Sequence, residues 1–194
     1  MRSVAGRYGS RMTLAPGVDP ALGRCVEATR SLFGAAACSI ALVGEDGGTL
    51  EFVASDGAGS EEIVGVTIPV SRGIAGWAAM SGQPIAVRDV QTDARFARDV
   101  AESTRYVPDA IYAAPMLDAE GEVLGVASVL DPAVEETSDW TLHVLGTIAG
   151  LMALVTTATA VTSQPAGQQP LADLGGDLLR LVESWRGGQT GRSE

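Results

Sequence analysis

The side chains best suited to bind a small molecule are concentrated in the middle of the chain. Arginines there can donate hydrogen bonds to a carboxylate or phosphate, and aromatic residues can form apolar or stacking walls. The pattern predicts a site for a small anionic or polar ligand. Each residue also has a plainer interpretation, because aromatic side chains pack in cores and mixed-charge segments form their own ion pairs. The residues expected at the site are Arg72, Trp77, Arg95, Phe96, Arg98, Tyr106 and Tyr112.

The composition excludes several other kinds of chemistry. All 13 cationic residues are arginine, so the lysine needed for Schiff-base, P-loop or kinase chemistry is missing. A single histidine, His143, cannot build a multi-histidine metal site. We therefore expect no catalytic residue, no metal and no cofactor. Cys25 and Cys38 indicate core packing in a reducing cytoplasm, with a small redox enzyme that uses either thiol as the alternative.

The charge distribution also limits the partners. A net charge of −11 disfavours nucleic acid and anionic membrane surfaces. Residues 142–161 are apolar and long enough to span a bilayer, but no arginine flanks them closely, so we expect a core helix and no membrane partner. Residues 1–17 are rich in glycine, serine and arginine without any period, which indicates a disordered basic arm.

The elements that must position the candidate site follow from periodicity. A helix is expected from 18 to 33, where apolar residues recur at helical spacing. Short apolar runs bounded by turn residues predict strands, and the charged stretch after the third of them predicts a loop with a short helix near 94–103. The expected strands are 37–43, 49–54, 64–70, 110–117 and 122–130.

Glycines punctuate the stretch from Pro69 to Phe96. Gly73 and Gly76 allow the backbone of a short helix to approach the layer beneath it, and Trp77 gives that helix an apolar anchor. Gly82 should end the helix, and Pro84 should start the following strand, where it need not donate to the ladder. Further on, residues 114–130 form a second motif, with a proline, a turn at 118–121 and then Gly-Val at 125–126.

These two motifs, in this order, resemble those of GAF domains, the small sensory modules of signalling proteins. The resemblance covers about residues 19–162. It implies an α+β sandwich with a mostly antiparallel sheet of five or six strands. The terminal helices would cover one face, and a lidded pocket beneath residues 71–106 would lie on the other. Residues 130–139 lack the asparagine, lysine and phenylalanine of cyclic-nucleotide members, and no cysteine or histidine is placed for bilin or haem.

A long helix from 138 to 162 is apolar all round, so all of its faces must be covered. In GAF proteins the terminal helices commonly pair with those of a second subunit. We therefore expect a homodimer, with cover by the first helix of the same subunit as the alternative. The residues expected in the dimer interface are Leu145, Gly146, Ile148, Gly150 and Ala153.

The domain organisation predicted in this way has five parts. In chain order these parts are a basic arm (1–17), a GAF domain (18–162), a linker (163–170), an amphipathic helix (171–186) and a disordered tail (187–194). We expect a cytoplasmic, non-enzymatic sensory or regulatory protein that binds a small molecule or partner. It would signal through the helix seam to a separate signalling protein. The alternative is a dimeric scaffold with a vestigial pocket, acting through the 171–186 helix, which docks on its own domain or on a partner.

Overall fold

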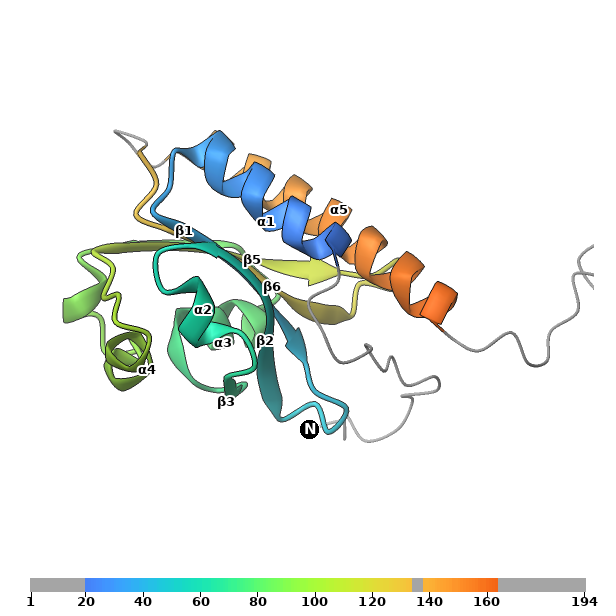
Figure 1. Ribbon diagram of the computed structural model, residues 1–194, viewed down its shortest axis with the longest axis horizontal. Helices are drawn as coiled ribbons and strands as arrows, with labels where there is room; N and C mark the ends of the chain where they lie inside the picture. The colour runs from blue at the N-terminus through green and yellow to red at the C-terminus, as the bar shows by residue number, and fades with distance from the viewer. Residues whose placement is uncertain (1–19, 134–137, 164–194) are drawn as a thin grey trace, which may run out of the picture. The chain divides into compact units, whose positions relative to one another are not determined.

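The computed structural model describes residues 20–133 and 138–163. Its centre is one six-stranded sheet in which each strand is antiparallel to its neighbours, in the order β3-β2-β1-β6-β5-β4 (Figure 1). The expected α+β sandwich with a five- or six-stranded antiparallel sheet is confirmed. The strands are β1 (Ala37–Val43), β2 (Thr49–Gly57), β3 (Thr67–Pro69), β4 (Ile85–Arg88), β5 (Ala110–Leu117) and β6 (Val123–Leu130).

Helices cover both faces of the sheet. The terminal helices α1 (Pro20–Phe33) and α5 (Asp139–Ser163) lie side by side on one face (Figure 1). The other face carries the shorter elements, so the expected placement of the terminal helices is also confirmed. These shorter elements are α2 (Ser60–Ile63), α3 (Gly73–Ser81), the single 3₁₀ turn η1 (Val90–Thr92) and α4 (Arg98–Ser103).

Two separate hydrophobic cores result, one on each face of the sheet. Successive side chains of a strand point to opposite faces, so a central strand supplies both cores in turn. In β1, Cys38 and Ile40 pack beneath α1 and α5, whereas Ala41 packs beneath the short helices. This two-sided burial explains why the sequence of β1 is apolar almost without interruption.

Some element boundaries differ from the prediction. Strand β2 continues to Gly57 instead of ending at residue 54, because residues 55–57 also pair with β1. The strand expected over 64–70 is only three residues long, and the segment before it forms α2. Parts of the chain assigned above to an arm, a linker, an amphipathic helix and a tail lie outside the described residues.

Gly76 and Gly82 act as predicted, but Gly73 does not: its added Cβ would make only ordinary contact, and its left-handed φ of 76° is what favours glycine there. A Cβ added to Gly76 would lie 2.5 Å from the carbonyl oxygen of Val70, so only glycine allows α3 to pack this closely on the strand end. Gly82 has a φ of 64°, and its N–H donates to the carbonyl of Ala78 as a helix C-cap. Both the approach of α3 and its end are therefore encoded locally.

The orientation of α5 corrects part of the predicted dimer interface. Leu145 and Ala153 are fully or almost fully buried in their own domain, packed against the sheet and α1, so neither can contact a second subunit. Ile148 is half-buried against the same core. The exposed side of the helix instead carries Trp140, Leu151 and Leu154.

Helix α5 is long and apolar enough to cross a membrane by length and composition alone, with a mean hydropathy of 1.6 over Asp139–Ala158. A core helix of a soluble domain passes the same test. Its buried stripe lies on the sheet of this domain, and the N–H of Thr141 donates to the Ser138 hydroxyl as an N-cap. Of the window Asp139–Ala158, 33% is buried inside the domain, so the packing on the sheet covers one side of α5.

Candidate functional site

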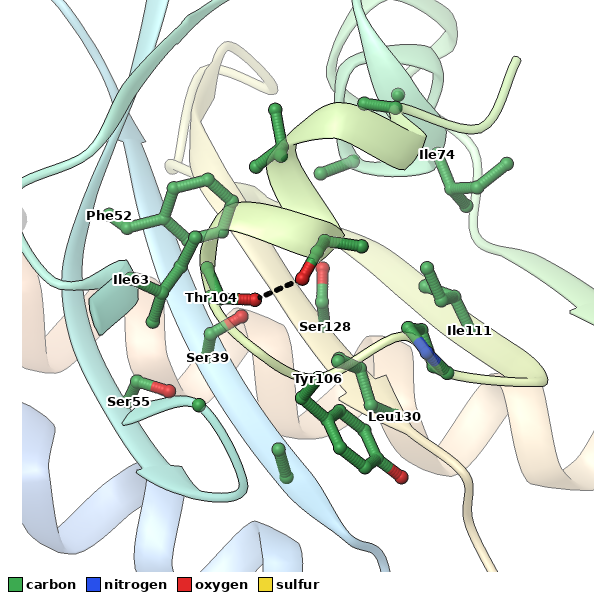
Figure 2. Close-up of a pocket in the computed structure, with 18 of the residues that line it drawn as sticks. Ser39, Phe52, Ser55, Ile63, Ile74, Thr104, Tyr106, Ile111, Ser128 and Leu130 are labelled. Carbon is green, nitrogen blue, oxygen red and sulfur yellow. Dashed lines mark hydrogen bonds between the residues drawn. The ribbon is translucent and has the colours of Figure 1, made fainter. Parts of the chain in front are cut away.

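A cavity of about 110 Å³ lies between the sheet and the segment that includes α4 (Figure 2). Strands β1, β2 and β6 form its floor, and α3, α4 and the residues after α4 form its roof and sides. Most of the lining side chains are apolar, and the polar ones in the described part of the chain are hydroxyls. The lining residues labelled in Figure 2 are Ser39, Phe52, Ser55, Ile63, Ile74, Thr104, Tyr106, Ile111, Ser128 and Leu130.

Two of the aromatic residues predicted for the site, Phe96 and Tyr106, line this cavity. The Tyr106 hydroxyl donates a hydrogen bond to the carboxylate of Asp131. The same carboxylate accepts hydrogen bonds from the backbone N–H groups of Asp109 and Ala110. Burial and this carboxylate raise the pKa of Tyr106 above its ordinary value. Tyr106 thus presents its ring to the cavity while its hydroxyl fixes the end of the lid to β6.

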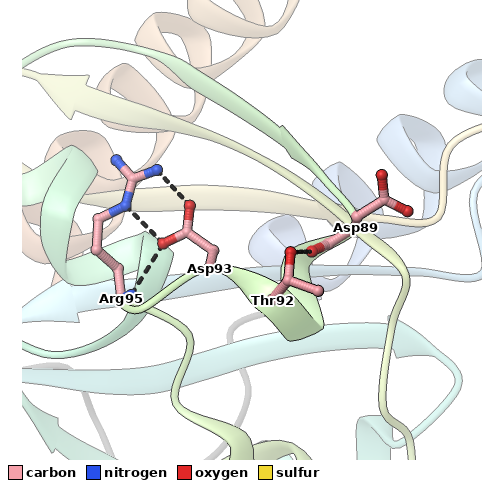
Figure 3. Close-up of polar contacts among 4 residues, drawn as sticks. All are labelled: Asp89, Thr92, Asp93 and Arg95. Atoms are coloured by element: carbon pink, nitrogen blue, oxygen red, sulfur yellow. Dashed lines mark hydrogen bonds and ion pairs between the residues drawn. The ribbon is translucent and has the colours of Figure 1, made fainter.

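The predicted arginines do not reach into the cavity. Arg95 makes a two-pronged ion pair with Asp93, with N···O distances of 2.8 and 2.6 Å (Figure 3). Hydrogen bonds from the side chain and backbone of Arg95 lower the pKa of Asp93 to about 2. Arg72 pairs with Asp99 through a single guanidinium N–H, and Arg98 donates to the backbone carbonyl of Gln91.

Arg72, Trp77 and Arg95 line a second hollow, of about 640 Å³, beside α3. The Arg95 guanidinium lies 5.4 Å from the centre of the Trp77 ring. Because each of its two arginines is neutralised by an aspartate, this hollow offers an anionic ligand no net positive charge. The alternative stated above for the mixed-charge segment, a solvated surface held by its own ion pairs, describes these residues.

Tyr112 corrects the predicted site. It is fully buried in the core beneath α1 and α5, on the opposite face of the sheet from the cavity. Its neighbours Ile111 and Ala113 point to the cavity side. Strand β5 is covered on both faces, so its sequence contains no polar alternation that would reveal which residues face the pocket.

Three serines that the sequence analysis missed lie on the cavity floor. In the strand register Ser39 of β1 pairs with Ser55 of β2 on one side and with Ser128 of β6 on the other. A row of hydroxyls therefore crosses three neighbouring strands on the cavity side. In sequence, Ser39 and Ser128 each interrupt an apolar segment, whereas β2 also carries Glu51 and Asp56 and gives Ser55 no such signal. Pairing of the strands is needed to bring the three serines together.

The family model of the GAF domain matches residues 18–155. This match covers the two glycine motifs, the whole sheet and most of α5. The chain belongs to the GAF family.

Among the described residues, no group of histidine, cysteine and acidic side chains could hold a metal ion.

Curated relatives of this GAF domain include cGMP-specific 3',5'-cyclic phosphodiesterases from Drosophila melanogaster and other Drosophila species. The D. melanogaster protein is 36% identical over 74 residues, which make up 38% of this chain and 6% of that protein. The chain therefore spans only a small part of the relatives it matches.

Solved structures show the same fold at low sequence identity. The GAF domain of an Acinetobacter phosphoenolpyruvate-protein phosphotransferase has a TM-score of 0.64 and 18% identity, over 78% of this chain and 89% of that one. A free methionine-R-sulfoxide reductase from Neisseria meningitidis, in complex with its substrate, has a TM-score of 0.60 and 19% identity, over 76% and 83%. The fold therefore occurs both in a GAF domain of a phosphotransferase and in a reductase.

The cysteines of this GAF domain lie on the helix side of the sheet, away from the cavity. Cys38 is fully buried there, and Cys25 is half-buried on α1 in the same core. Burial, with a smaller contribution from Asp56, raises the pKa of Cys38 to about 12. At neutral pH the Cys38 thiolate, the form that reacts, is therefore suppressed on the order of 10³-fold.

This suppression predicts selective alkylation. Iodoacetamide should modify Cys25 of the folded protein first and leave Cys38 unmodified through neutral and mildly alkaline pH, as measured by peptide mass spectrometry. In guanidinium chloride both cysteines should react at similar rates, since the raised pKa belongs to the folded state. Rapid alkylation of Cys38 in the folded protein would contradict the burial and would support the thiol redox alternative.

Proposed function

We propose that this GAF domain is a sensory or regulatory module that binds a small molecule in the cavity beneath α4. The observation that carries the proposal is the cavity itself, a partly open hollow between the sheet and the segment that includes α4, lined by apolar groups and hydroxyls. Arg72 and Arg95 are held in ion pairs outside the cavity. A non-enzymatic role fits this lining, which offers no charged group for acid–base chemistry among the described residues.

A second part of the proposal is that two copies of the domain pair through the outer side of α5. Trp140, Leu151 and Leu154 are between 57% and 72% exposed along this side, an amount of apolar surface that a monomer rarely leaves in water on one helix. Gly146 and Gly150 have nothing within 4 Å of an added Cβ, so a second helix could approach there. The proposed interface therefore keeps Gly146 and Gly150 but loses the buried Leu145 and Ala153. The exposed residues named above take their place.

The sheet connects the two parts. Within β1, Ser39 faces the cavity while Cys38 and Ile40 face α1 and α5. A ligand that moves the cavity floor therefore acts on the packing of α5 through adjacent residues. A coupling of about 1–3 kcal/mol would be enough to change the dimer geometry, which a separate signalling protein in the cytoplasm would then read.

The test combines a metabolite screen with a measurement of molecular mass. A metabolite that binds should raise the thermal stability, by about 2.7 kcal/mol at 100 times its dissociation constant. Light scattering should give the mass of a dimer. A dimer that no metabolite stabilises would support the scaffold alternative with a vestigial pocket, and a stable monomer would overturn the α5 seam.

A further inference from the structure

Two hydroxyl groups on the cavity floor have no protein partner. Ser39 and Ser128 are only 6% and 5% exposed, and no hydrogen bond involves either side-chain oxygen within the described residues. In the described residues, every side-chain oxygen that is completely shielded from solvent has a hydrogen-bond partner. Since the hydroxyls of Ser39 and Ser128 have none, they must be accessible from the cavity that they line. A buried polar group costs free energy unless it is hydrogen-bonded, so these two need a partner from the cavity.

The strand register places the two hydroxyls side by side. Ser39 and Ser128 are directly paired in the antiparallel ladder of β1 and β6, and both side chains point to the cavity side. In Figure 2 the two hydroxyl oxygens rise from the floor toward Thr104. Side chains of such a pair lie about 5 Å apart at Cβ, a spacing at which one polar group can contact both.

The other hydroxyls of the cavity are already used within the protein. Ser55 donates to the carbonyl of Cys38, Thr104 donates to the carbonyl of Ala101, and Tyr106 donates to Asp131. Beyond these hydroxyls the lining side chains are apolar, and in the described chain none of them carries a charge. The hydroxyls of Ser39 and Ser128 are therefore the one pair of unpaired polar groups among the described residues that line this otherwise apolar cavity.

We propose, on the basis of the function proposed above, that the ligand is a compact neutral molecule with an apolar body and one hydroxyl, carbonyl or amide group. That group contacts the hydroxyls of Ser39 and Ser128, which can each donate or accept, and the apolar body lies against Phe52, Ile74 and Ile111. A cavity of about 110 Å³ is in the size range that holds a single aromatic ring.

A charged ligand does not fit this chamber. Moving an anion from water into an apolar cavity costs several kcal/mol unless a cation or several donors meet it. The nearby Arg72 and Arg95 are already paired with aspartates and lie outside the cavity. A cyclic nucleotide adds a ribose and a base to its phosphate, and so exceeds the cavity in size as well as in charge.

The experiment measures binding of four probes to the full chain by ligand-observed NMR titration. Phenol should bind about fivefold more tightly than benzene, because one net hydrogen bond separates them. Benzoate, similar in size to phenol but anionic, and cGMP should not bind. In the double variant Ser39→Ala/Ser128→Ala, phenol should lose its preference over benzene, whereas benzene should bind as before.

Controls separate loss of the hydroxyls from loss of the fold. Ser103 does not line the cavity, and its hydroxyl donates to the carbonyl of Val100. The variant Ser103→Ala should therefore keep the preference for phenol. The single variants Ser39→Ala and Ser128→Ala, checked by circular dichroism, provide the same comparison if the double variant fails to fold. Equal binding of phenol and benzene to the wild-type chain, or a chamber that holds only water, would overturn the inference.

The outcomes also distinguish this inference from the function on which it rests. If phenol does not bind but cGMP, benzoate or another charged metabolite stabilises the domain, the neutral-ligand inference fails and the sensory function stands. If neither these probes nor any compound of the metabolite screen binds, both fail. Binding of phenol with unchanged preference in the double variant would place the polar contact elsewhere and would overturn the role of Ser39 and Ser128.

Discussion

Leu145→Ala should lower the free energy of unfolding by about 3 kcal/mol, whereas Leu154→Ala on the same helix should change it by less than about 0.5 kcal/mol. Leu145 is fully buried between α5 and the sheet, so its removal leaves a cavity in the helix-side core. Leu154 is 66% exposed and loses little when truncated in a single subunit. Both changes delete the same atoms, so the difference reports only which side of α5 faces the sheet.

Denaturant titration at low protein concentration measures both values. The same two variants also test the proposed seam, because Leu154→Ala should weaken self-association in sedimentation while Leu145→Ala should leave the outer side of α5 unchanged in any protein that folds. A large loss of stability from Leu154→Ala in the monomer, with little from Leu145→Ala, would mean that the helix is rotated relative to the orientation described here.

Gly76→Ala should destabilise the domain by about 2–3 kcal/mol. The new methyl group would lie 2.5 Å from the Val70 carbonyl oxygen, a backbone atom that cannot move without displacing the start of α3. Because α3 forms part of the cavity wall through Ile74 and Ala75, the variant should also weaken binding of any ligand there. Among glycine-to-alanine changes within residues 73–82, Gly76→Ala should therefore cause the largest loss in free energy of unfolding.

Gly82→Ala is the matched control for this prediction. Gly82 also lies in the 69–96 stretch, but nothing lies within 4 Å of an added Cβ, so only its left-handed conformation opposes the change. It should cost about 1 kcal/mol. Thermal unfolding of both variants gives the comparison, and equal losses at the two positions would show that the close approach of α3 to Val70 is not what Gly76 provides.

The proposed ligand chemistry separates this domain from the relatives that its sequence matches. The curated relatives are named for cGMP, and their match covers 38% of this chain. The cavity here has uncharged walls in the described part of the chain and a pair of free serine hydroxyls. We therefore expect this GAF domain to bind a neutral molecule, whereas the relatives are named for a charged nucleotide.

The sequence alone predicts the strands, a short helix that ends at Gly82 and, through the resemblance to GAF domains, the antiparallel sheet. These features depend on residues close together in the chain: the alternation or continuity of apolar residues within a strand, and glycines where a backbone must turn or approach closely. Such local constraints act over a few residues, so they can be interpreted without knowledge of distant partners. The aromatic side chains of Phe96 and Tyr106 indicate a pocket wall by residue type, and both line the cavity.

Only the tertiary structure decided which side of α5 is buried, how the lid arginines are used and which groups line the cavity. A helix that is apolar on every side has no polar face to indicate its orientation, so Leu145 and Leu154 look alike in sequence. Arg72 meets Asp99 across 27 residues of chain, a pairing that no local pattern predicts. Ser39 and Ser128 become neighbours only through the register of β1 and β6, because long-range strand pairing, not sequence spacing, brings their hydroxyls together.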